Sequence, residues 1–195
     1  MNRRDLIKTL GIVTAGTIIA PSCEKLDVFS SIKQFDVKKG DNDYFGPQIP
    51  ITMRCPIHFY AYIPDSQIHP LYNDEKCDGI WNTLFGTASR VFEDKDENRA
   101  MFLFRPVYEN NTIEITSCTH NVGEITKEEW TTEIEPNRYY EYEIRFKNGR
   151  AEYRFENTYV RGDSIGEVNF IEKFLEPYNG GYCGAYRDSY IVLKR

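Results

Sequence analysis

Acidic side chains are the first residues of this chain to consider for chemistry. Hydrolysis of a glycosidic bond needs two carboxyl groups, one on each side of the bond. One strand with the pattern E-x-D-x-x-E can supply them, but neither Glu133-Ile134-Glu135 nor the acidic cluster at 93–97 has this spacing. The cluster at 93–97 is typical of a solvated loop, with a calcium site as the alternative. The sequence therefore predicts no hydrolytic pair of carboxylates.

Histidine and cysteine side chains do not form a recognisable metal motif. The three histidines, His58, His69 and His120, are far apart in the sequence, and no two of the five cysteines have C-x-x-C spacing. Isolated residues such as His58 and His120 fit structural roles better than catalytic ones. Because the chain also lacks a phosphate-binding glycine loop and a nucleophile elbow, we expect no metal and no cofactor.

Aromatic residues are the unusual feature of the composition: 14 Tyr, 12 Phe and 2 Trp make up 14% of the chain. An exposed aromatic ring can stack on the apolar face of a sugar while its polar edge stays wet. Trp130 follows an acidic stretch at 124–129 and Trp81 lies near a turn, so we predict both as rim residues that bind a ligand. The alternative is that these rings fill the core of a chain with few leucines.

The charge balance excludes one class of partner. The 195 residues include 24 Lys and Arg against 30 Asp and Glu, a net charge of −6 with a pI near 5.2. Binding to nucleic acid needs a basic face that neutralises phosphates. We therefore expect no nucleic-acid partner, and the length predicts a single domain with a tail.

The first 22 residues have the parts of an export signal. Basic residues precede an apolar run over 10–20, and small residues precede Cys23. Ala20-Pro21-Ser22-Cys23 resembles the lipobox of bacterial lipoproteins, in which the cysteine carries lipid, although the family usually begins this motif with leucine. The prediction is a signal peptide over 1–22 and a lipid anchor at Cys23 that holds the protein to a membrane of the bacterial cell envelope. Ordinary cleavage near Ser22, which leaves a thiol at Cys23, is the alternative.

The route of export affects the remaining cysteines. Arg3-Arg4-Asp5-Leu6-Ile7-Lys8 resembles a twin-arginine export motif, with an ordinary basic leader as the alternative. Removal of the leader leaves a net charge of −8. An exported protein can form disulfides, but twin-arginine export of a folded protein from a reducing compartment argues against them. The sequence does not decide between two disulfides and buried free thiols for the remaining cysteines, which are Cys55, Cys77, Cys118 and Cys183.

The body of the chain has the pattern of an all-β protein. Residues 23–50 are expected to be a tether that contains a possible first strand, and 51–195 to be the β-sandwich domain. Short apolar runs separated by turn residues indicate the strands of a sandwich or barrel. We expect them at 32–37, 57–63, 87–92, 100–108, 112–118 and 189–194.

One hairpin can be predicted down to its register. Asn148-Gly149 favours a type I′ turn, which pairs Lys147 with Arg150 and thereby sets every other pair between 139–147 and 150–156. One face then carries apolar pairs such as Ile144 with Tyr153. The other face carries opposite charges, which indicates an antiparallel sheet with one face on the core.

A short helix is expected after this hairpin. Ser164 and Glu167 have the spacing of a capping box. Val168, Ile171 and Leu175 then recur at helical intervals until a proline ends the run.

Several short motifs recur in the same order in a known family. They are Asn82-Thr83-Leu84-Phe85-Gly86, Asn98-Arg99-Ala100, and Pro177-Tyr178-Asn179-Gly180-Gly181 followed by Ala185 and Asp188. With them, the chain from Cys77 onward resembles an uncharacterised family of concanavalin-like β-sandwich proteins of bacterial envelopes. It departs from that family at Asn179, where phenylalanine is expected, and at Tyr186, where proline is expected. The resemblance implies a two-sheet antiparallel sandwich of the jelly-roll type and brings no assigned chemistry.

A second resemblance concerns catalysis. Gln67-Ile68-His69 is similar to the Q-I-H tripeptide of alginate lyases, whose histidine takes a proton from the sugar, and Tyr178 stands where such an enzyme might hold its tyrosine. The arginine-rich strand with which those lyases neutralise uronate carboxylates has no counterpart here. The negative charge of the chain also disfavours a polyanionic substrate.

Three functions follow as hypotheses. The preferred one is an envelope-anchored, non-catalytic β-sandwich that binds a glycan or a protein partner. The alternatives are a polysaccharide-active enzyme that uses His69, Gln67 and Tyr178, and a structural subunit of an envelope assembly.

Cys23→Ala tests the predicted anchor. Lipid chains contribute about 0.8 kcal/mol per buried CH₂, so two or more hold a protein on a membrane. We expect the variant to move from the membrane fraction to the soluble fraction and the wild type to incorporate labelled fatty acid. A wild type that takes up no fatty acid contradicts the prediction.

Overall fold

The computed structural model describes residues 32–46, 56–69, 80–90, 97–120, 127–147, 149–164, 172–179 and 184–195. The predicted signal peptide, Cys23, Cys55, Cys77, Cys183 and the acidic cluster at 93–97, apart from Glu97, lie outside these ranges. The described part contains a short 3-10 turn, η2, at Asp65–Gln67. Its strands are β1 Lys33–Val37, β2 Ile57–Tyr62, β3 Asn82–Arg90, β4 Glu97–Val107, β5 Thr112–His120, β6 Lys127–Ile134, β7 Tyr139–Lys147, β8 Arg150–Phe155, β9 Thr158–Ser164, β10 Glu172–Leu175 and β11 Ser189–Lys194.

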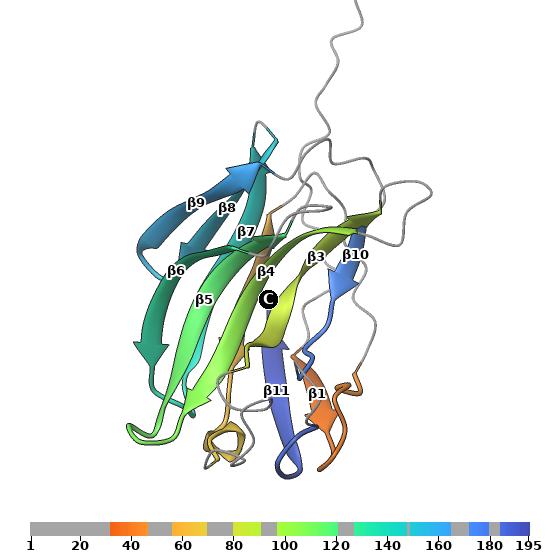
Figure 1. Cartoon of the computed structure of the whole chain (residues 1–195), viewed down its shortest axis with the longest axis vertical. Helices are drawn as coiled ribbons and strands as arrows, with labels where there is room; N and C mark the ends of the chain where they lie inside the picture. The colour runs from red at the N-terminus through yellow and green to blue at the C-terminus, as the bar shows by residue number, and fades with distance from the viewer. Residues whose placement is uncertain are drawn as a thin grey trace, which may run out of the picture.

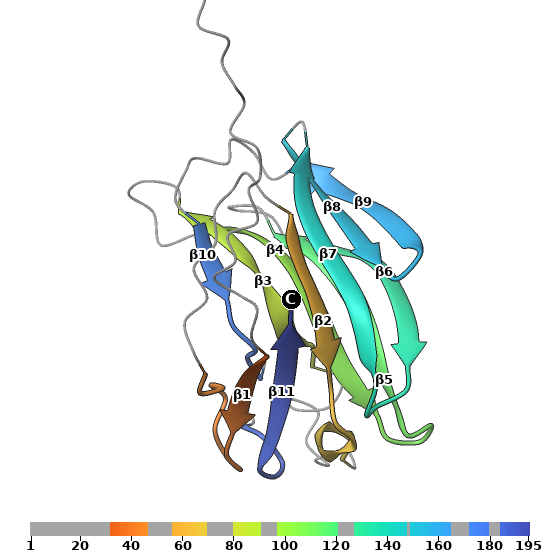
Figure 2. The same ribbon diagram turned by 180° about the vertical axis from the view of Figure 1, so that it is seen from behind.

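Two antiparallel sheets pack face to face. Figure 1 shows the five-stranded sheet, in the order β10-β3-β4-β5-β6, in front of the six-stranded sheet, and Figure 2 shows the molecule from behind. The six-stranded sheet has the order β1-β11-β2-β7-β8-β9. This arrangement confirms the predicted jelly-roll sandwich.

Aromatic rings fill the space between the sheets. Tyr142 of β7 lies against Phe102 of β4, with ring centroids 5.0 Å apart, and against Phe85 of β3 at 5.9 Å. Phe102 also contacts Tyr153 of β8 at 5.5 Å. All four side chains are almost fully buried. These rings stabilise the sandwich by burying apolar surface between the sheets. This role explains the high aromatic content of a chain with few leucines.

The predicted strands are present, with some changes at their ends. The runs at 112–118 and 189–194 correspond to β5 and β11. β3 begins five residues before the predicted start at Thr87, because the Leu84 and Phe85 side chains are buried. The sequence reading missed β6, β9 and β10, whose strands are polar or short.

The predicted helix is wrong where the structure describes it. Glu172–Leu175 forms β10, which pairs antiparallel with β3 and places Phe174 opposite Thr87. The Phe174 ring is buried against Phe59 at 5.7 Å and Phe85 at 6.4 Å. Insertion of this ring between the sheets outweighs the helical spacing of the apolar residues. Residues 165–171, which include Val168 and Ile171, lie outside the described residues.

The register predicted for the β7–β8 hairpin is confirmed. Lys147 pairs with Arg150, Ile144 with Tyr153, and Tyr142 with Phe155. Gly149 has a φ of 69°, the left-handed conformation that a type I′ turn needs. Asn148 lies outside the described residues.

No helix among the described residues is long and apolar enough to cross a membrane.

Gly149→Val tests the role of the turn. A β-branched residue at positive φ is strained, so we expect a loss of about 1 kcal/mol or more in the free energy of unfolding. Chemical denaturation measures this loss. Gly149→Asn is the matched control, because asparagine tolerates this conformation and should cost less. An unchanged stability of Gly149→Val contradicts the prediction.

Candidate functional site

A short backbone ladder joins the two sheets along one edge of the sandwich. Asp36 of β1 exchanges hydrogen bonds with Phe45, at 2.9 and 2.6 Å, and so closes a hairpin over 36–45. Asp43 in this hairpin pairs with Tyr178, and Tyr178 exchanges hydrogen bonds of 2.8 and 3.0 Å with Thr83 of β3. Figures 1 and 2 place β1 and β10 on the same side of the sandwich. We call these pairs, which run from Asp36 through Phe45, Asp43 and Tyr178 to Thr83, the seam.

The 36–45 hairpin is also held from its other side. Gly40 donates to the carbonyl of Ala185 and Ala185 donates to that of Asp41, both at 2.8 Å. A Cβ atom on Gly184 would lie 2.0 Å from the Gly40 carbonyl oxygen, so the close approach requires glycine there. Asp188 accepts from the Lys39 backbone N–H at 2.9 Å, and this bond holds the pKa of the Asp188 carboxyl below its usual value. The hairpin therefore has fixed contacts on both sides.

A cleft of about 610 Å³ lies beside the seam. Its volume is in the range of small-molecule sites, about 300–1,000 Å³. The described residues that line it come from the 36–45 hairpin, β3, β4, β10 and the segment after β10. They are Asp43, Tyr44, Thr83, Arg99, Met101, Phe174, Leu175, Glu176, Pro177 and Tyr178.

Strand alternation explains how β4 reaches this cleft. Ala100 and Phe102 point into the core and are almost completely buried. Because successive side chains of a strand point to opposite faces, Arg99 and Met101 face outward from the five-stranded sheet. Arg99 is exposed, whereas Met101 is buried under its neighbours.

The polar part of the lining has the groups that bind sugar hydroxyls. Tyr178 is 41% exposed and presents an aromatic ring whose backbone is held by the seam. Arg99 supplies hydrogen-bond donors, and Asp43 and Glu176 supply acceptors. With one cation and two carboxylates among the described lining residues, the cleft suits a neutral ligand better than a polyanion.

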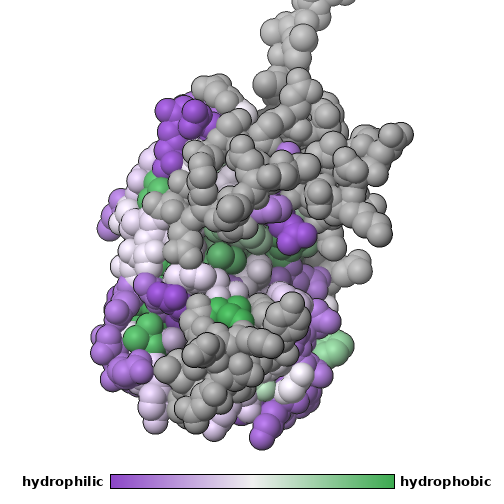
Figure 3. All heavy atoms as spheres, in the orientation of Figure 1, coloured by the Kyte–Doolittle hydropathy of each residue, from purple (hydrophilic) through white to green (hydrophobic). Residues whose placement is uncertain are grey.

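Trp81 lies next to this cleft without lining it. It packs against an outer cluster of Met101, Leu103, Cys118 and Leu175, two of which also line the cleft. The Arg105 guanidinium lies over the Trp81 ring, 4.5 Å from its centroid, and Arg105 is ion-paired with Glu114. Figure 3 shows this side of the molecule, where small apolar groups lie among polar residues. The role of Trp81 in binding stays a prediction.

Trp130 lies in a different place from the rim position expected for it. It is half-buried in β6 and packs against the main core, with its ring 5.3 Å from Phe155 of the opposite sheet. Its register partner on β5 is Ser117, which is fully buried. This packing favours the alternative of a core aromatic, and a contact of Trp130 with ligand stays a prediction.

The three residues of the lyase hypothesis lie in different surroundings. The Gln67 side chain is buried and donates to the hydroxyl of Tyr44. The His69 ring stacks on Tyr186, with centroids 5.1 Å apart. Of the three, only Tyr178 is among the described residues that line the cleft.

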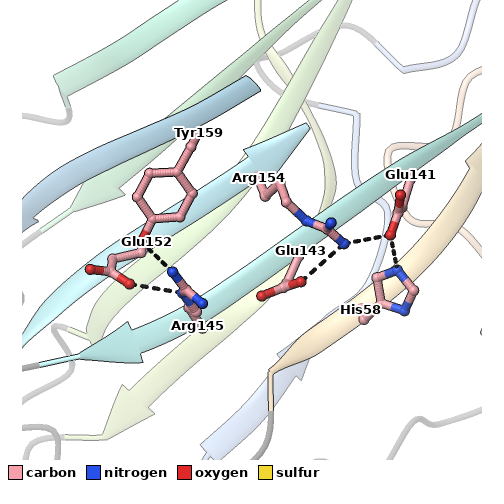
Figure 4. Close-up of polar contacts among 7 residues, drawn as sticks. All are labelled: His58, Glu141, Glu143, Arg145, Glu152, Arg154 and Tyr159. Carbon is pink, nitrogen blue, oxygen red and sulfur yellow. Dashed lines mark hydrogen bonds and ion pairs between the residues drawn. The ribbon is translucent and has the colours of Figure 1, made fainter. Parts of the chain in front are cut away.

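A charged network covers the outer face of the six-stranded sheet (Figure 4). Glu141 of β7 accepts from His58 of β2 at 2.7 Å and from Arg154 of β8, and Arg154 also pairs with Glu143 at 3.2 Å. The hydrogen bond from His58, with help from Arg154, holds the pKa of the Glu141 carboxyl below its usual value. His58 thus takes part in a side-chain network on the sheet surface, and its structural role stays a prediction.

A second group of polar contacts on the same face reaches β9 (Figure 4). Arg145 donates to Glu152 and to the hydroxyl of Tyr159, both at 2.8 Å. The hydrogen bond with Tyr159, followed by that with Arg145, lowers the pKa of the Glu152 carboxyl. Ion pairs between opposite charges thus link β7 with β8 on this face, and such cross-strand pairs stabilise a sheet.

The sequence reading missed the contribution of Asp43, Arg99 and Glu176 to the cleft. Arg99 and Tyr178 belong to motifs of the family resemblance, and that recurrence was the available signal. Among the described residues, no group of three His, Cys, Asp or Glu side chains is placed to hold a metal ion. His120 is the register partner of Arg99 on β5, and Cys118 is buried in the outer cluster.

Comparisons with known proteins add the following. No protein-family model and no curated protein matches the sequence. One similar solved structure is a family 16 glycoside hydrolase of a Bacteroides ovatus mixed-linkage glucan locus, in complex with a G4G4G3G product. The two sequences are 7% identical, and the TM-score is 0.48 over 84% of this chain and 79% of that chain. A family 16 endo-glucanase from the same organism, solved with G4G3G-2F-DNP, gives the same values. LamAcat from Zobellia galactanivorans matches with 11% identity and a TM-score of 0.41 over 83% and 74% of the two chains. At this similarity the fold assignment rests on the strand pairing of the chain itself.

Glu141→Gln tests the network on the six-stranded sheet. The Glu141 carboxyl has a lower pKa in the folded state than in the unfolded chain, where the pKa of glutamate is near 4.3. Its charged form therefore stabilises the fold at a pH above this unfolded pKa. The stabilisation is lost as the pH falls through the folded pKa. We expect a loss of about 0.5–1 kcal/mol at pH 7 that shrinks toward pH 3. Thermal unfolding across this range measures it. Glu109→Gln, in the exposed turn after β4, is the control, and an equal loss at both pH values contradicts the prediction.

Proposed function

We propose that this chain is a non-catalytic, envelope-anchored protein that binds a neutral glycan in the cleft beside the seam. The observation that carries the proposal is the combination of an exposed tyrosine ring on a fixed backbone with one cation and two carboxylates in a single cleft. Tyr178, Arg99, Asp43 and Glu176 supply these groups.

Each group has a defined role in such a complex. The apolar face of a sugar ring stacks on Tyr178, which loses little conformational entropy because its backbone is already paired with Thr83. Sugar hydroxyls donate to the carboxylates of Asp43 and Glu176 and accept from the guanidinium of Arg99. Met101 and Leu175 provide the apolar floor that such pockets have.

The outward positions of β4 support a binding role without catalysis. From Arg99 to Arg105 they carry two arginines and two apolar residues, Met101 and Leu103. Glu114, which faces Arg105 from β5, is already engaged in an ion pair with it. The central strand of the sheet beside the cleft thus presents no pair of carboxylates over this span.

The lipid anchor is part of the same proposal. A lipid on Cys23 would hold the folded domain at a membrane of the cell envelope, with the residues between Cys23 and β1 as a tether. In this position the cleft can reach glycans of the envelope or of its surroundings, and an envelope protein is the other partner expected.

A polysaccharide-active enzyme is the second candidate, because the two carboxylates Asp43 and Glu176 line one cleft. Two carboxyl groups on either side of a glycosidic bond can act as acid and as base or nucleophile. This candidate requires turnover that is lost in both Asp43→Asn and Glu176→Gln, whereas the binding proposal requires no turnover. The lyase hypothesis requires cleavage of a uronate polymer that His69→Ala abolishes.

Tyr178→Ala tests the proposed function. We expect it to weaken binding of a neutral oligosaccharide by about 1–3 kcal/mol, as loss of a buried interfacial aromatic does. Tyr178→Phe, which keeps the ring, should retain most of the affinity. A panel of neutral and uronate polysaccharides identifies the ligand, calorimetry measures Kd, and a degradation assay runs in parallel.

Tyr108→Ala is the matched control. Tyr108 is 52% exposed in the turn after β4 and is not among the described residues that line the cleft. Equal weakening by Tyr108→Ala and Tyr178→Ala, or binding of uronate polymers alone, contradicts the proposal.

A further inference from the structure

Gln67 is a buried polar residue whose side chain is hydrogen-bonded to Tyr44, one of the residues that line the cleft. It ends the 3-10 turn η2, and its side chain is 7% exposed. Its amide nitrogen donates to the hydroxyl of Tyr44 at 2.8 Å and lies 3.5 Å from the carbonyl oxygen of Tyr190. Gln67 is not among the described residues that line the cleft, whereas its partner Tyr44 is.

Tyr44 links Gln67 to Asn179. Its ring is part of the main core, and its hydroxyl accepts from Gln67 and donates to the Asn179 side-chain oxygen at 3.2 Å. Burial raises the pKa of the Tyr44 hydroxyl, so the hydroxyl keeps its proton and remains a donor at all physiological pH values. Tyr44 is also one of the residues that line the cleft.

Asn179 links this series of hydrogen bonds to Tyr178, the residue whose ring is exposed at the cleft. Asn179 is buried, and its backbone N–H donates to the carbonyl of Asn42 at 2.9 Å. It directly follows Tyr178, whose own backbone pairs with Thr83 and Asp43. A displacement of Asn179 therefore moves Tyr178 and the wall formed by the 36–45 hairpin.

The turn that carries Gln67 is a firm anchor. Arg187 donates to three carbonyl oxygens around this turn, those of Ser66, Asp65 and Ile68, at 2.8, 2.9 and 3.1 Å. Ser66 and Ser189 are joined by a hydrogen bond of 2.6 Å between their hydroxyls. The turn is thus tied to the start of β11 and cannot easily follow a movement of the cleft wall.

We propose that Gln67 is a positioning residue of the cleft, which fixes Tyr178 through the hydrogen-bonded series Gln67, Tyr44 and Asn179. The effect on ligand affinity rests on the proposed function, whereas the positioning itself does not. Gln67 thereby has a role in place of the catalytic one suggested by the Gln67-Ile68-His69 tripeptide.

Hydrogen exchange of the full chain tests the positioning without any ligand. The probes are the backbone amides of Tyr178 and Asn179, which donate to Thr83 and Asn42. Gln67→Leu keeps the approximate volume and removes the bond to Tyr44, and Tyr44→Phe removes both bonds of its hydroxyl. We expect exchange at both amides to rise about fivefold or more beyond any change in global stability, which the amide of Phe102 in the core of β4 reports.

Ser66→Ala is the matched control. It breaks a hydrogen bond in the same turn but leaves the series from Gln67 to Asn179 intact, so exchange at Tyr178 and Asn179 should stay at the wild-type rate. Local exchange that is unchanged in Gln67→Leu overturns the proposal, as does an equal rise in Ser66→Ala. Because Gln67→Leu retains the Tyr44 hydroxyl, it serves as the test if Tyr44→Phe does not fold.

A binding measurement separates this inference from the proposed function. With the neutral oligosaccharide that the panel identifies, Gln67→Leu should raise Kd about fivefold in the wild-type background and leave it unchanged in a Tyr178→Ala background. Equal weakening in both backgrounds overturns the link to Tyr178. If wild type binds no saccharide while the exchange result holds, the proposed function fails and the positioning role of Gln67 stands.

Discussion

The backbone pairing of Tyr178 with Asp43 on one side and Thr83 on the other is the constraint on which this structure depends. A sandwich of two sheets is held together mainly by its core, and its edges can move apart where no backbone bonds cross between the sheets. Here the 36–45 hairpin and Tyr178 continue the hydrogen bonding from β1 to β3. The same bonds that close this edge also hold residues of the cleft wall, so the shape of the cleft depends on the contacts that join the sheets.

The core and the cleft are linked through β4 and β10. Phe102 on β4 and Phe174 on β10 are buried between the sheets, and this burial decides which way the alternate residues point. Arg99, Met101 and Leu175 face outward because their neighbours face inward. A change of register by one residue in either strand would exchange the two sets and remove the cleft, so the aromatic core specifies the binding surface as well as the fold.

The fold was predictable from sequence where the determinants are local. The Asn148-Gly149 dipeptide predicts the register of the β7–β8 hairpin, because the type I′ turn that it favours leaves little choice of pairing. β10 was misread because Val168, Ile171 and Leu175 have helical spacing, while the insertion of Phe174 beside Phe59 is a contact between distant parts of the chain. Such contacts leave no periodic trace in the sequence.

The cleft could be predicted only in part for the same reason. Its described lining comes from residues 43–44, 83, 99, 101 and 174–178, and no local pattern indicates that they meet. Tyr178 is indicated by a motif and by a catalytic resemblance, and neither signal shows that it meets Asp43 and Arg99 in one cleft. The tripeptide indicates Gln67 without indicating that its side chain is buried and donates to Tyr44.

Charged side chains lie on both outer faces of the sandwich. On the six-stranded sheet, Glu141, Glu143 and Glu152 each form an ion pair with Arg154 or Arg145. On the five-stranded sheet, the described lining of the cleft keeps an excess of carboxylate over cation. A polyanion would meet repulsion there from a chain that is already negative, whereas neutral hydroxyl groups would find acceptors in those carboxylates and donors in Arg99. The charge distribution therefore points to the same class of ligand as the exposed ring of Tyr178 does.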